Sequence, residues 1–199
     1  YKGEWYEAYK RLEMTHSLPE ITGRVCPALC EQACTLSINT APVSIKQIEL
    51  AIVEHAFKQG WVTPIIPKKE TGKSIAIIGS GPAGLAAASI LRRLGHKITV
   101  FEKSDKIGGI LRYGIPDFKL NKQIIDRRIR LMEEEGIIFQ TNVDMGYDIS
   151  ARYLKKTFDR VLITIGASEP RNINAPGRDL DNIHFAMEYL IRSNQYVAG

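Results

Sequence analysis

A glycine-rich hexapeptide constrains the fold of this chain more than any other feature. Its pattern is G-x-G-x-x-G, and we call its residues the glycine turn: Gly79, Ser80, Gly81, Pro82, Ala83 and Gly84. An apolar run over 75–78 precedes it, and an alanine-rich helical stretch that ends near Leu94 follows it. A second apolar run over 98–101 ends at Glu102, 18 positions after Gly84. This order predicts a βαβ unit with parallel strands and a right-handed crossover.

The glycine turn has the residue types that a bound pyrophosphate requires. Gly79 permits a tight turn, Gly81 lets backbone amides approach the pyrophosphate, and Gly84 lets the helix pack close to the strand. Pro82 and Ala83 open the helix, whose amino end carries a partial positive charge that favours an anion. The sequence therefore predicts a dinucleotide site at the glycine turn.

Glu102 indicates which dinucleotide binds here. At the end of a strand, its two carboxylate oxygens can accept hydrogen bonds from both ribose hydroxyls of an adenosine, and its charge repels the 2'-phosphate of NADP. Gly108 and Gly109, six residues after Glu102, predict a second close approach of the backbone. Gly166 directly follows an apolar run over 160–165. A simple NAD site requires neither of these glycine features, so FAD is the favoured cofactor.

The residues after the βαβ unit continue the alternation of helices and strands. Helices are predicted over 122–135 and 182–193, and strands over 137–139 and 160–165. This alternation is typical of the α/β class. We therefore predict a Rossmann-like, doubly wound parallel sheet that binds FAD and occupies residues 71–199.

Residues 1–70 predict a small helical region and a linker in front of the sheet. Helices are expected over 5–14 and 45–59, and Ser44 with Gln47 would form a capping box at the start of the second. Prolines and a charge cluster over 61–73 mark the linker. Four apolar residues would line one face of the second helix: Ile45, Ile48, Ile52 and Ala56.

The only three cysteines, Cys26, Cys30 and Cys34, lie close together in the helical region. Their odd number argues against a disulfide framework, and their spacing differs from the C-x-x-C pairs of zinc ribbons. The second gap is also too long for the C-x-x-x-C-x-x-C motif of radical enzymes that use S-adenosylmethionine. Thiolates suit iron–sulfur clusters, but a cubane cluster normally takes four. The cysteine segment, residues 26–34, therefore predicts either part of a cluster site or three buried, reduced thiols.

Composition and charge exclude several other classes. The chain has 199 residues, of which 44% are hydrophobic and 25% charged, as in ordinary globular proteins. The net charge of +5 comes from scattered basic residues with acidic neighbours, so no nucleic-acid partner is expected. The absence of an apolar run of about 20 residues and of a signal peptide predicts a cytoplasmic protein without a membrane partner. Since the chain lacks an initiator Met, we expect a fragment of a longer protein.

Several motifs together resemble the FAD domain of glutamate synthase small subunits. Those in the sheet region are the glycine turn with the run before it, and the stretches over 101–103, 108–111, 114–120, 126–133 and 184–188. The stretch over 23–34, which contains the cysteines, is also similar to that family, so the resemblance covers nearly the whole chain. One departure is Thr164-Ile165-Gly166, where the family usually has Ala-Thr-Gly.

The resemblance implies that the chain holds FAD and contributes ligands to two four-iron clusters. Cys26 and Cys30 would serve one cluster and Cys34 the other, with the remaining ligands supplied by cysteines that precede this chain. Glu49 matches a position at which a sister family has a non-cysteine ligand. Further contacts with FAD are implied for Lys103, Gly109, Leu111, Lys119, Val143 and Gly166.

The resemblance also implies an oxidoreductase. In the family, NADPH binds to a second glycine-rich domain that follows this region, and electrons pass through FAD and the clusters to a large subunit for glutamate synthesis. No acid–base catalytic residue is expected, and the fragment alone is not expected to carry out the full reaction. Two alternatives remain: a sister flavin oxidoreductase of the dihydropyrimidine dehydrogenase or ferredoxin-NADP oxidoreductase type, and a non-catalytic nucleotide-binding module.

Overall fold

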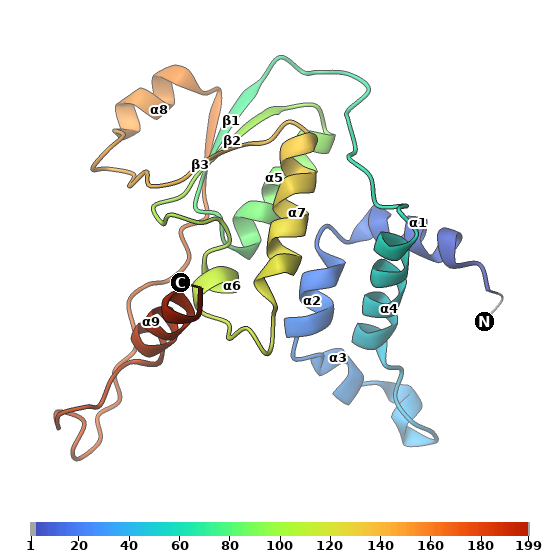
Figure 1. Cartoon of the computed structure of the whole chain (residues 1–199), viewed down its shortest axis with the longest axis horizontal. Helices are drawn as coiled ribbons and strands as arrows, with labels where there is room; N and C mark the ends of the chain where they lie inside the picture. Colours follow the sequence, from blue (N-terminus) through green and yellow to red (C-terminus); the bar gives the residue numbers. More distant parts are fainter. Residues whose placement is uncertain (1–2, 199) are drawn as a thin grey trace.

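The computed structural model describes residues 3–198 and shows a helical N-terminal region beside a parallel β-sheet with its own helices (Figure 1). The helical region, coloured blue to teal in Figure 1, leads into the sheet through residues 61–73, which form no helix or strand, as predicted. The last helix lies on the far side of the sheet region from the helical region (Figure 1).

Short helices dominate the first region. They are α1 (Trp5–Thr15), α2 (Pro19–Val25), α3 (Leu29–Gln32), a 3-10 turn (Thr35–Ile38) and α4 (Ile45–Lys58). The predicted helices over 5–14 and 45–59 correspond to α1 and α4. We did not predict α2, because its sequence contains Pro19 and Gly23, which are typical of turns and loops. Pro19 occupies the first turn of α2, where its missing N–H breaks no helical hydrogen bond.

The start of α4 differs from the predicted capping box. Ser44 occupies the N-cap position, but its side chain makes no capping hydrogen bond. Instead, the carboxylate of Glu31 accepts a hydrogen bond of 2.8 Å from the backbone N–H of Lys46. The predicted apolar face is confirmed in part: Ala56 is fully buried and Ile45 and Ile52 are half-buried, but Ile48 is 49% exposed and Val53 is buried in its place.

Four parallel strands form the sheet, in the order β3-β2-β1-β4. The chain runs outward from β1 to β3 and then returns to place β4 on the other side of β1, as in a doubly wound sheet. The strands are β1 (Ser74–Ile78), β2 (Lys97–Phe101), β3 (Ile138–Gln140) and β4 (Arg160–Ile163). The helices of this region are α5 (Pro82–Arg93), α6 (Ile110–Tyr113), α7 (Lys122–Glu134), α8 (Ala151–Thr157) and α9 (Ala186–Ala198).

The predicted α/β fold class is confirmed, with shifted ends for some elements. The strand predicted over 160–165 ends at Ile163, and the helix predicted over 182–193 begins at Ala186. Both α6 and α8 are short and were not predicted. Within residues 3–198, every helix is too short or too polar to span a bilayer.

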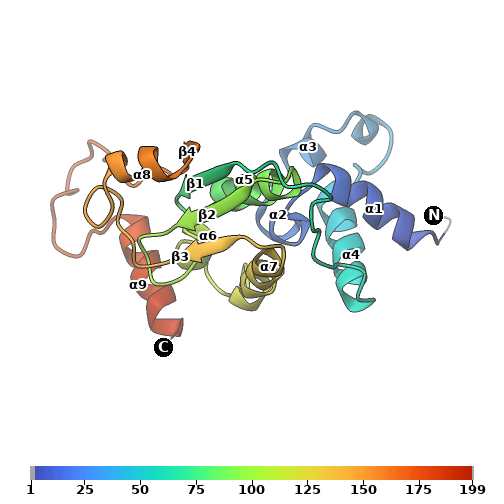
Figure 2. The ribbon, with the colours of Figure 1, turned by 90° about the horizontal axis from the view of Figure 1, so that it is seen from above.

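Helices cover both faces of the sheet, because alternate strand residues point to opposite sides. On one side Ile77 of β1 packs with Leu85 of α5 and Ile125 of α7. On the other side Ile78 packs with Leu154 of α8. Figure 2 shows α7 and α8 on opposite sides of the strands. The carboxyl ends of β1 and β2 are thereby held by cores on both faces.

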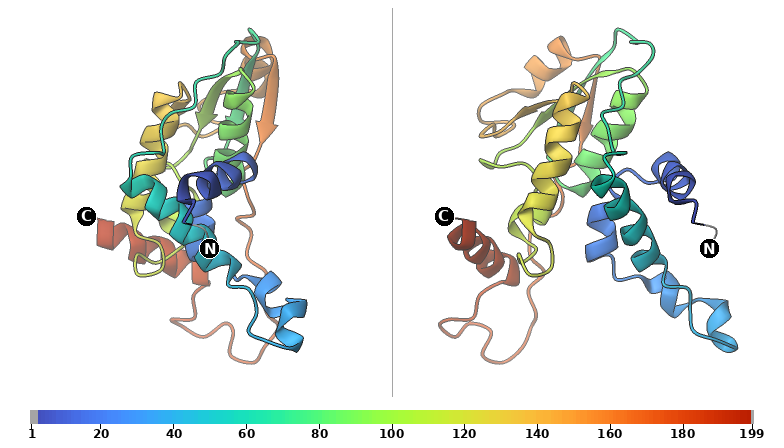
Figure 3. Two further views of the ribbon diagram at one scale, coloured as in Figure 1. Left: turned by 90° about the vertical axis from the view of Figure 1, so that its right-hand side faces the viewer. Right: turned by 45° about the vertical axis from the view of Figure 1, so that its right-hand side comes forward.

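Helix α2 joins the helical region to the sheet region. Ile21 of α2 belongs to the same hydrophobic core as the residues of α5 and α7. Glu20 is fully buried, and its carboxylate accepts hydrogen bonds of 2.5 and 2.9 Å from the guanidinium of Arg128 on α7. The guanidinium of Arg127 lies 3.5 Å from the ring centroid of Phe57 on α4. The right-hand view of Figure 3 shows α2, in blue, beside α7, in yellow.

Candidate functional site

Gly79 and Gly84 are required by the fold itself. Gly79 has a φ of +99°, which favours glycine, and a Cβ there would lie 2.5 Å from the carbonyl oxygen of Thr164. Gly84 lies in the first turn of α5, and a Cβ there would lie 2.0 Å from the carbonyl oxygen of Gly79. The chain therefore turns tightly after β1, and α5 packs directly against the turn, as predicted.

Gly81 differs from the other two glycines of the turn. Its φ is −65°, which any residue can adopt, and a Cβ there would meet no described atom within 4 Å. The open space adjoins the amino end of α5, where Pro82 and Ala83 form an exposed first turn. The first N–H groups of a helix have no partners inside the helix and favour an anion. These residues therefore fit a bound pyrophosphate.

The second glycine loop, Gly108 and Gly109, lies against the glycine turn. Both residues have positive φ values, +130° and +52°. A Cβ on Gly109 would lie 2.9 Å from the Cα of Gly81. The N–H of Gly108 donates a hydrogen bond of 3.0 Å to the hydroxyl oxygen of Ser80. The two glycine-containing segments are therefore in contact beside the open space at Gly81.

Glu102 is buried at the end of β2 and is held by hydrogen bonds. Its Oε2 accepts from the Ser80 N–H at 3.0 Å and from the Ser80 hydroxyl at 2.5 Å, and its Oε1 accepts from the Ser104 N–H at 2.9 Å. Burial alone would raise the pKa of Glu102, but the hydrogen bonds from Ser80 and Ser104 outweigh it and lower the pKa. The carboxylate is therefore ionised at neutral pH.

These bonds limit how many hydrogen bonds Glu102 can accept from a ligand, and the predicted contact with both ribose hydroxyls stays a prediction. A carboxylate offers about four acceptor positions, and the protein already uses three of them. These three bonds leave one position, on Oε1, and the Ser104 hydroxyl also helps to lower the pKa of the carboxylate. Glu102 in this arrangement can accept one further hydrogen bond.

Thr164, directly after β4, contacts the glycine turn at Gly79. Its hydroxyl lies 3.0 Å from the carbonyl oxygen of Ile78 and 2.9 Å from that of Gly79. Gly166 has a φ of +71°, and a Cβ there would meet no described atom within 4 Å. The sequence pattern assigned a backbone role to Gly166 but no role to the Thr164 side chain.

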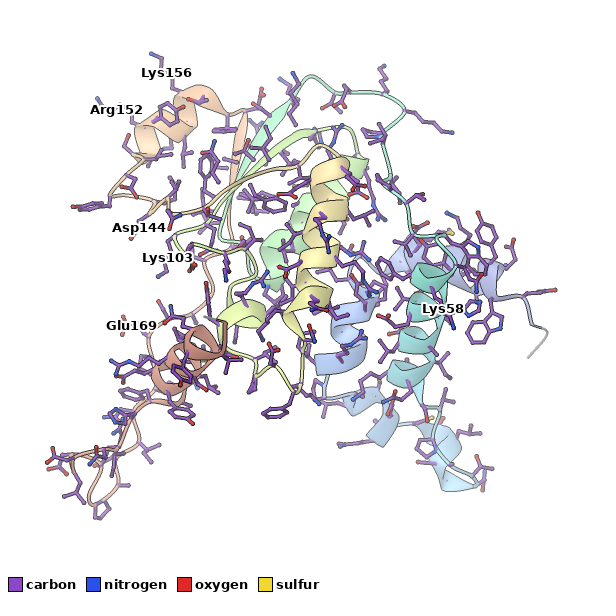
Figure 4. All side chains as sticks on the ribbon, in the orientation of Figure 1. Lys58, Lys103, Asp144, Arg152, Lys156 and Glu169 are labelled. Carbon is purple, nitrogen blue, oxygen red and sulfur yellow. The ribbon has the colours of Figure 1, made fainter. Side chains whose placement is uncertain are left out.

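The other residues predicted to contact FAD lie in different environments. Lys103, labelled in Figure 4, and Lys119 are exposed in loops. Val143 is half-buried, and its N–H donates a hydrogen bond of 3.0 Å to the carbonyl oxygen of Glu102. Leu111 is 2% exposed, and its side chain lies in the hydrophobic core. The Leu111 side chain is therefore a core residue, and its contact with a cofactor stays a prediction.

The cysteine segment contrasts with the glycine turn, because its side chains do not converge. Cys26 follows α2 and Cys30 lies on α3, and both thiols are free and exposed. Cys34 is half-buried before the 3-10 turn. Across the described part of the chain, no three His, Cys, Asp or Glu side chains are placed to hold one metal ion. The three thiols are therefore neither buried together nor gathered in one site.

Cys34 has the most specific surroundings of the three cysteines. Hydrogen bonds from backbone N–H groups, first that of Val43 and then those of Leu36 and Ser37, lower the pKa of its thiol. Such bonds are also a feature of sulfur ligands in iron–sulfur proteins. Glu49, the other predicted ligand, lies on α4 with its Oε2 4.0 Å from the Nε2 of His16. It is not grouped with the cysteines.

Two family profiles match this chain in succession. Residues 1–61 match dihydropyrimidine dehydrogenase domain II, 4Fe-4S cluster. Residues 73–197 match pyridine nucleotide-disulphide oxidoreductase. The first match contains the cysteine segment, and the second contains both glycine loops and Glu102.

Curated relatives confirm the resemblance to glutamate synthase small subunits. The chain is 53% identical over 190 residues to the glutamate synthase [NADPH] small chain of Bacillus subtilis, which covers 96% of this chain and 38% of that relative. It is 49% identical over 197 residues to glutamate synthase [NADH] of Schizosaccharomyces pombe, which covers 98% of this chain and 9% of that relative. The chain thus spans about two fifths of the bacterial small chain that it matches.

A solved structure also shares the sheet architecture. FprA of Mycobacterium tuberculosis in complex with NADPH is 26% identical, with a TM-score of 0.56 over 61% of this chain and 29% of FprA. The profile over 73–197 covers more than half of the chain and includes the glycine turn at the end of β1. By its sequence and its fold, the chain belongs to the pyridine nucleotide-disulphide oxidoreductase family.

Proposed function

We propose that this chain is the FAD-holding and cluster-ligating part of the small subunit of an NADPH-dependent glutamate synthase. The observation that carries the FAD assignment is the open space at Gly81, between the amino end of α5 and the second glycine loop. Relatives named glutamate synthase small chain, about half identical over nearly the whole chain, support the assignment to that enzyme.

The chain's own residues bind and orient the cofactor. Gly81, Pro82 and Ala83 present the amino end of α5 to the pyrophosphate, and the second glycine loop lies beside it. The remaining acceptor position on Glu102 binds a ribose hydroxyl. Lys103 and Lys119 supply positive charge from exposed loops, and the backbones of Gly109, Val143 and Gly166 contact the rest of the cofactor.

In the proposed reaction, FAD supplies the exchange between two-electron and one-electron transfer. NADPH binds in a further domain of the longer protein, and the electrons leave for the large subunit. Cys26 and Cys30 ligate one 4Fe-4S cluster and Cys34 the other, and the remaining ligands come from residues outside this chain. The exposed thiols of Cys26 and Cys30 are accessible for such shared ligation, and Glu49 is a candidate non-cysteine ligand.

We assign residues 1–70 to the cluster region with its linker and residues 71–199 to the FAD region. The matches over 1–61 and 73–197 and the irregular stretch over 61–73 support this division. We further propose that the large subunit is the protein partner, that neither nucleic acid nor membrane is a partner, and that the protein acts in the cytoplasm.

The proposal is tested by the visible spectrum of the purified protein, followed by denaturation and chromatography of any released chromophore. A yellow protein that releases FAD supports the flavin assignment, and added brown absorbance supports a cluster. A colourless protein that does not take up added FAD would overturn the assignment in favour of a different nucleotide. Bleaching by dithionite separates a redox cofactor from a non-catalytic nucleotide module.

Assignment to glutamate synthase itself needs a second measurement. The full-length protein with its large subunit should oxidise NADPH only when glutamine and 2-oxoglutarate are present. Oxidation that instead depends on ferredoxin or on a pyrimidine would assign the chain to a sister flavin oxidoreductase.

A further inference from the structure

Ser80 occupies the variable position between the first two glycines of the glycine turn, and its side chain is fully buried. Its hydroxyl donates a hydrogen bond of 2.5 Å to Oε2 of Glu102. The same hydroxyl oxygen accepts a hydrogen bond of 3.0 Å from the N–H of Gly108. One hydroxyl thus connects the glycine turn, the end of β2 and the second glycine loop.

These bonds determine how Glu102 can meet a ligand. Its Oε2 is occupied by the N–H and the hydroxyl of Ser80, and its Oε1 accepts from Ser104. The carboxylate cannot rotate without breaking bonds to both serines. Its remaining acceptor position therefore points in one direction. Removal of the Ser80 hydroxyl would leave the buried Gly108 N–H without its partner and leave Oε2 with only the hydrogen bond from the Ser80 N–H.

We propose that Ser80 is a positioning residue of the FAD site, a role that rests on the proposed binding of FAD. Its hydroxyl holds the Glu102 carboxylate in the orientation that accepts a ribose hydroxyl of the adenosine. It also holds the second glycine loop against Gly81, so that the two walls of the pyrophosphate site keep their spacing. Ser80 itself does not contact the cofactor.

The test compares two ligands on the FAD-depleted full-length protein: FAD, and an FAD analogue whose adenosine lacks both ribose hydroxyls. Wild-type protein should bind FAD about tenfold more tightly than the analogue, as expected for one hydrogen bond to a charged group. In Ser80→Ala this preference should fall to within about twofold. If Ser80 had only a structural role, Ser80→Ala would weaken the binding of FAD and of the analogue equally and keep the wild-type preference for FAD. That result would overturn the proposal.

Ser89→Ala is the matched control, because Ser89 is also a buried serine but lies farther along α5. It should leave the preference unchanged. If Ser80→Ala does not fold, as judged by circular dichroism, Ser80→Gly removes the same hydroxyl at a position flanked by glycines.

The outcomes separate this inference from the proposed function. A wild-type protein that binds no FAD contradicts the proposed function. A wild-type protein that binds FAD and the analogue equally, or a hydroxyl-free variant that keeps the preference, contradicts only the role of Ser80.

Discussion

The glycine turn and the cysteine segment, the two proposed cofactor sites, are built by different means. At the glycine turn, backbone shape makes the site: Gly79 and Gly84 fit where a Cβ would collide, and Glu102 is already fixed by Ser80. In the cysteine segment, Cys26 and Cys30 remain exposed and do not converge with Cys34. A site built from backbone can be complete within one folded unit, whereas a site built from side-chain ligands needs all its ligands at once.

The largest predicted effect comes from the buried Glu20–Arg128 pair, which joins the helical region to the sheet region. Arg128→Met should lower the free energy of unfolding by about 3–5 kcal/mol, because it leaves the buried Glu20 carboxylate without its partner. Glu20→Met together with Arg128→Met should recover much of this loss. Denaturant unfolding, followed by circular dichroism, measures both. Two separate transitions in the wild-type protein would show that the regions are independent domains and not parts of one core.

Gly84→Ala tests whether the glycine turn is fixed by packing. The added Cβ would lie 2.0 Å from the carbonyl oxygen of Gly79, so α5 must shift away from the turn. We expect a loss of about 1–3 kcal/mol in the free energy of unfolding. A variant with wild-type stability would show that the helix is not packed as closely as the structure has it.

Gly81→Ala, the matched control for Gly84→Ala, should keep the stability of the protein but weaken its binding of FAD. Because a Cβ at Gly81 meets open space, the free energy of unfolding should change by less than about 0.5 kcal/mol. The same methyl group would enter the proposed pyrophosphate position, so the affinity for FAD should fall at least about tenfold. Fluorescence titration measures this fall, and unchanged affinity would place the pyrophosphate elsewhere.

The hydrogen bonds of Glu102 predict a pH dependence. Its pKa is lowered in the folded protein, so its stabilising contribution is complete above the ordinary carboxyl pKa and is lost as the pH falls through the lowered value. Glu102→Gln should therefore be less stable than wild type at pH 7. The difference should shrink below about pH 4. A difference that does not change with pH would show that the carboxylate charge contributes nothing.

The smallest predicted effect is a change in the pH dependence of the reactivity of the Cys34 thiol. Backbone N–H groups lower the pKa of its thiol, so alkylation by iodoacetamide should remain fast below the ordinary thiol pKa of about 8.5. Peptide mass spectrometry gives the rate at each pH, and the urea-unfolded protein is the control. Equal profiles for the folded and unfolded protein would show that the backbone N–H groups do not lower the pKa of the Cys34 thiol.

The sequence predicted well those features that depend on near neighbours. The βαβ unit follows from an apolar run, a glycine turn and a helix within 27 residues, 75–101, and all three are present. Contacts between distant residues were missed. Glu31 caps α4 in place of Ser44, and the Leu111 side chain joins the core, because tertiary packing and not local pattern decides both.

The candidate site shows the same limit. The glycines and Glu102 were predicted, but the hydrogen bonds that orient Glu102 were not, because a side-chain rotamer cannot be read from spacing. A serine between the first two glycines is a weak signal, since its hydroxyl could equally face solvent. Thr164 was noted only as a departure from a pattern, although its hydroxyl faces the carbonyl oxygens of both Ile78 and Gly79.

The packing of α2 against α7 has a consequence for how the two regions could be recombined. Ile21 and the Glu20–Arg128 pair place part of the helical region inside the core of the sheet region. Residues 61–73 therefore do not set the separation between the proposed flavin site and the cysteine segment, because the packing of α2 sets it. A chimera joined within these residues would divide one hydrophobic core, whereas a longer connection would leave the path between the two sites the same length.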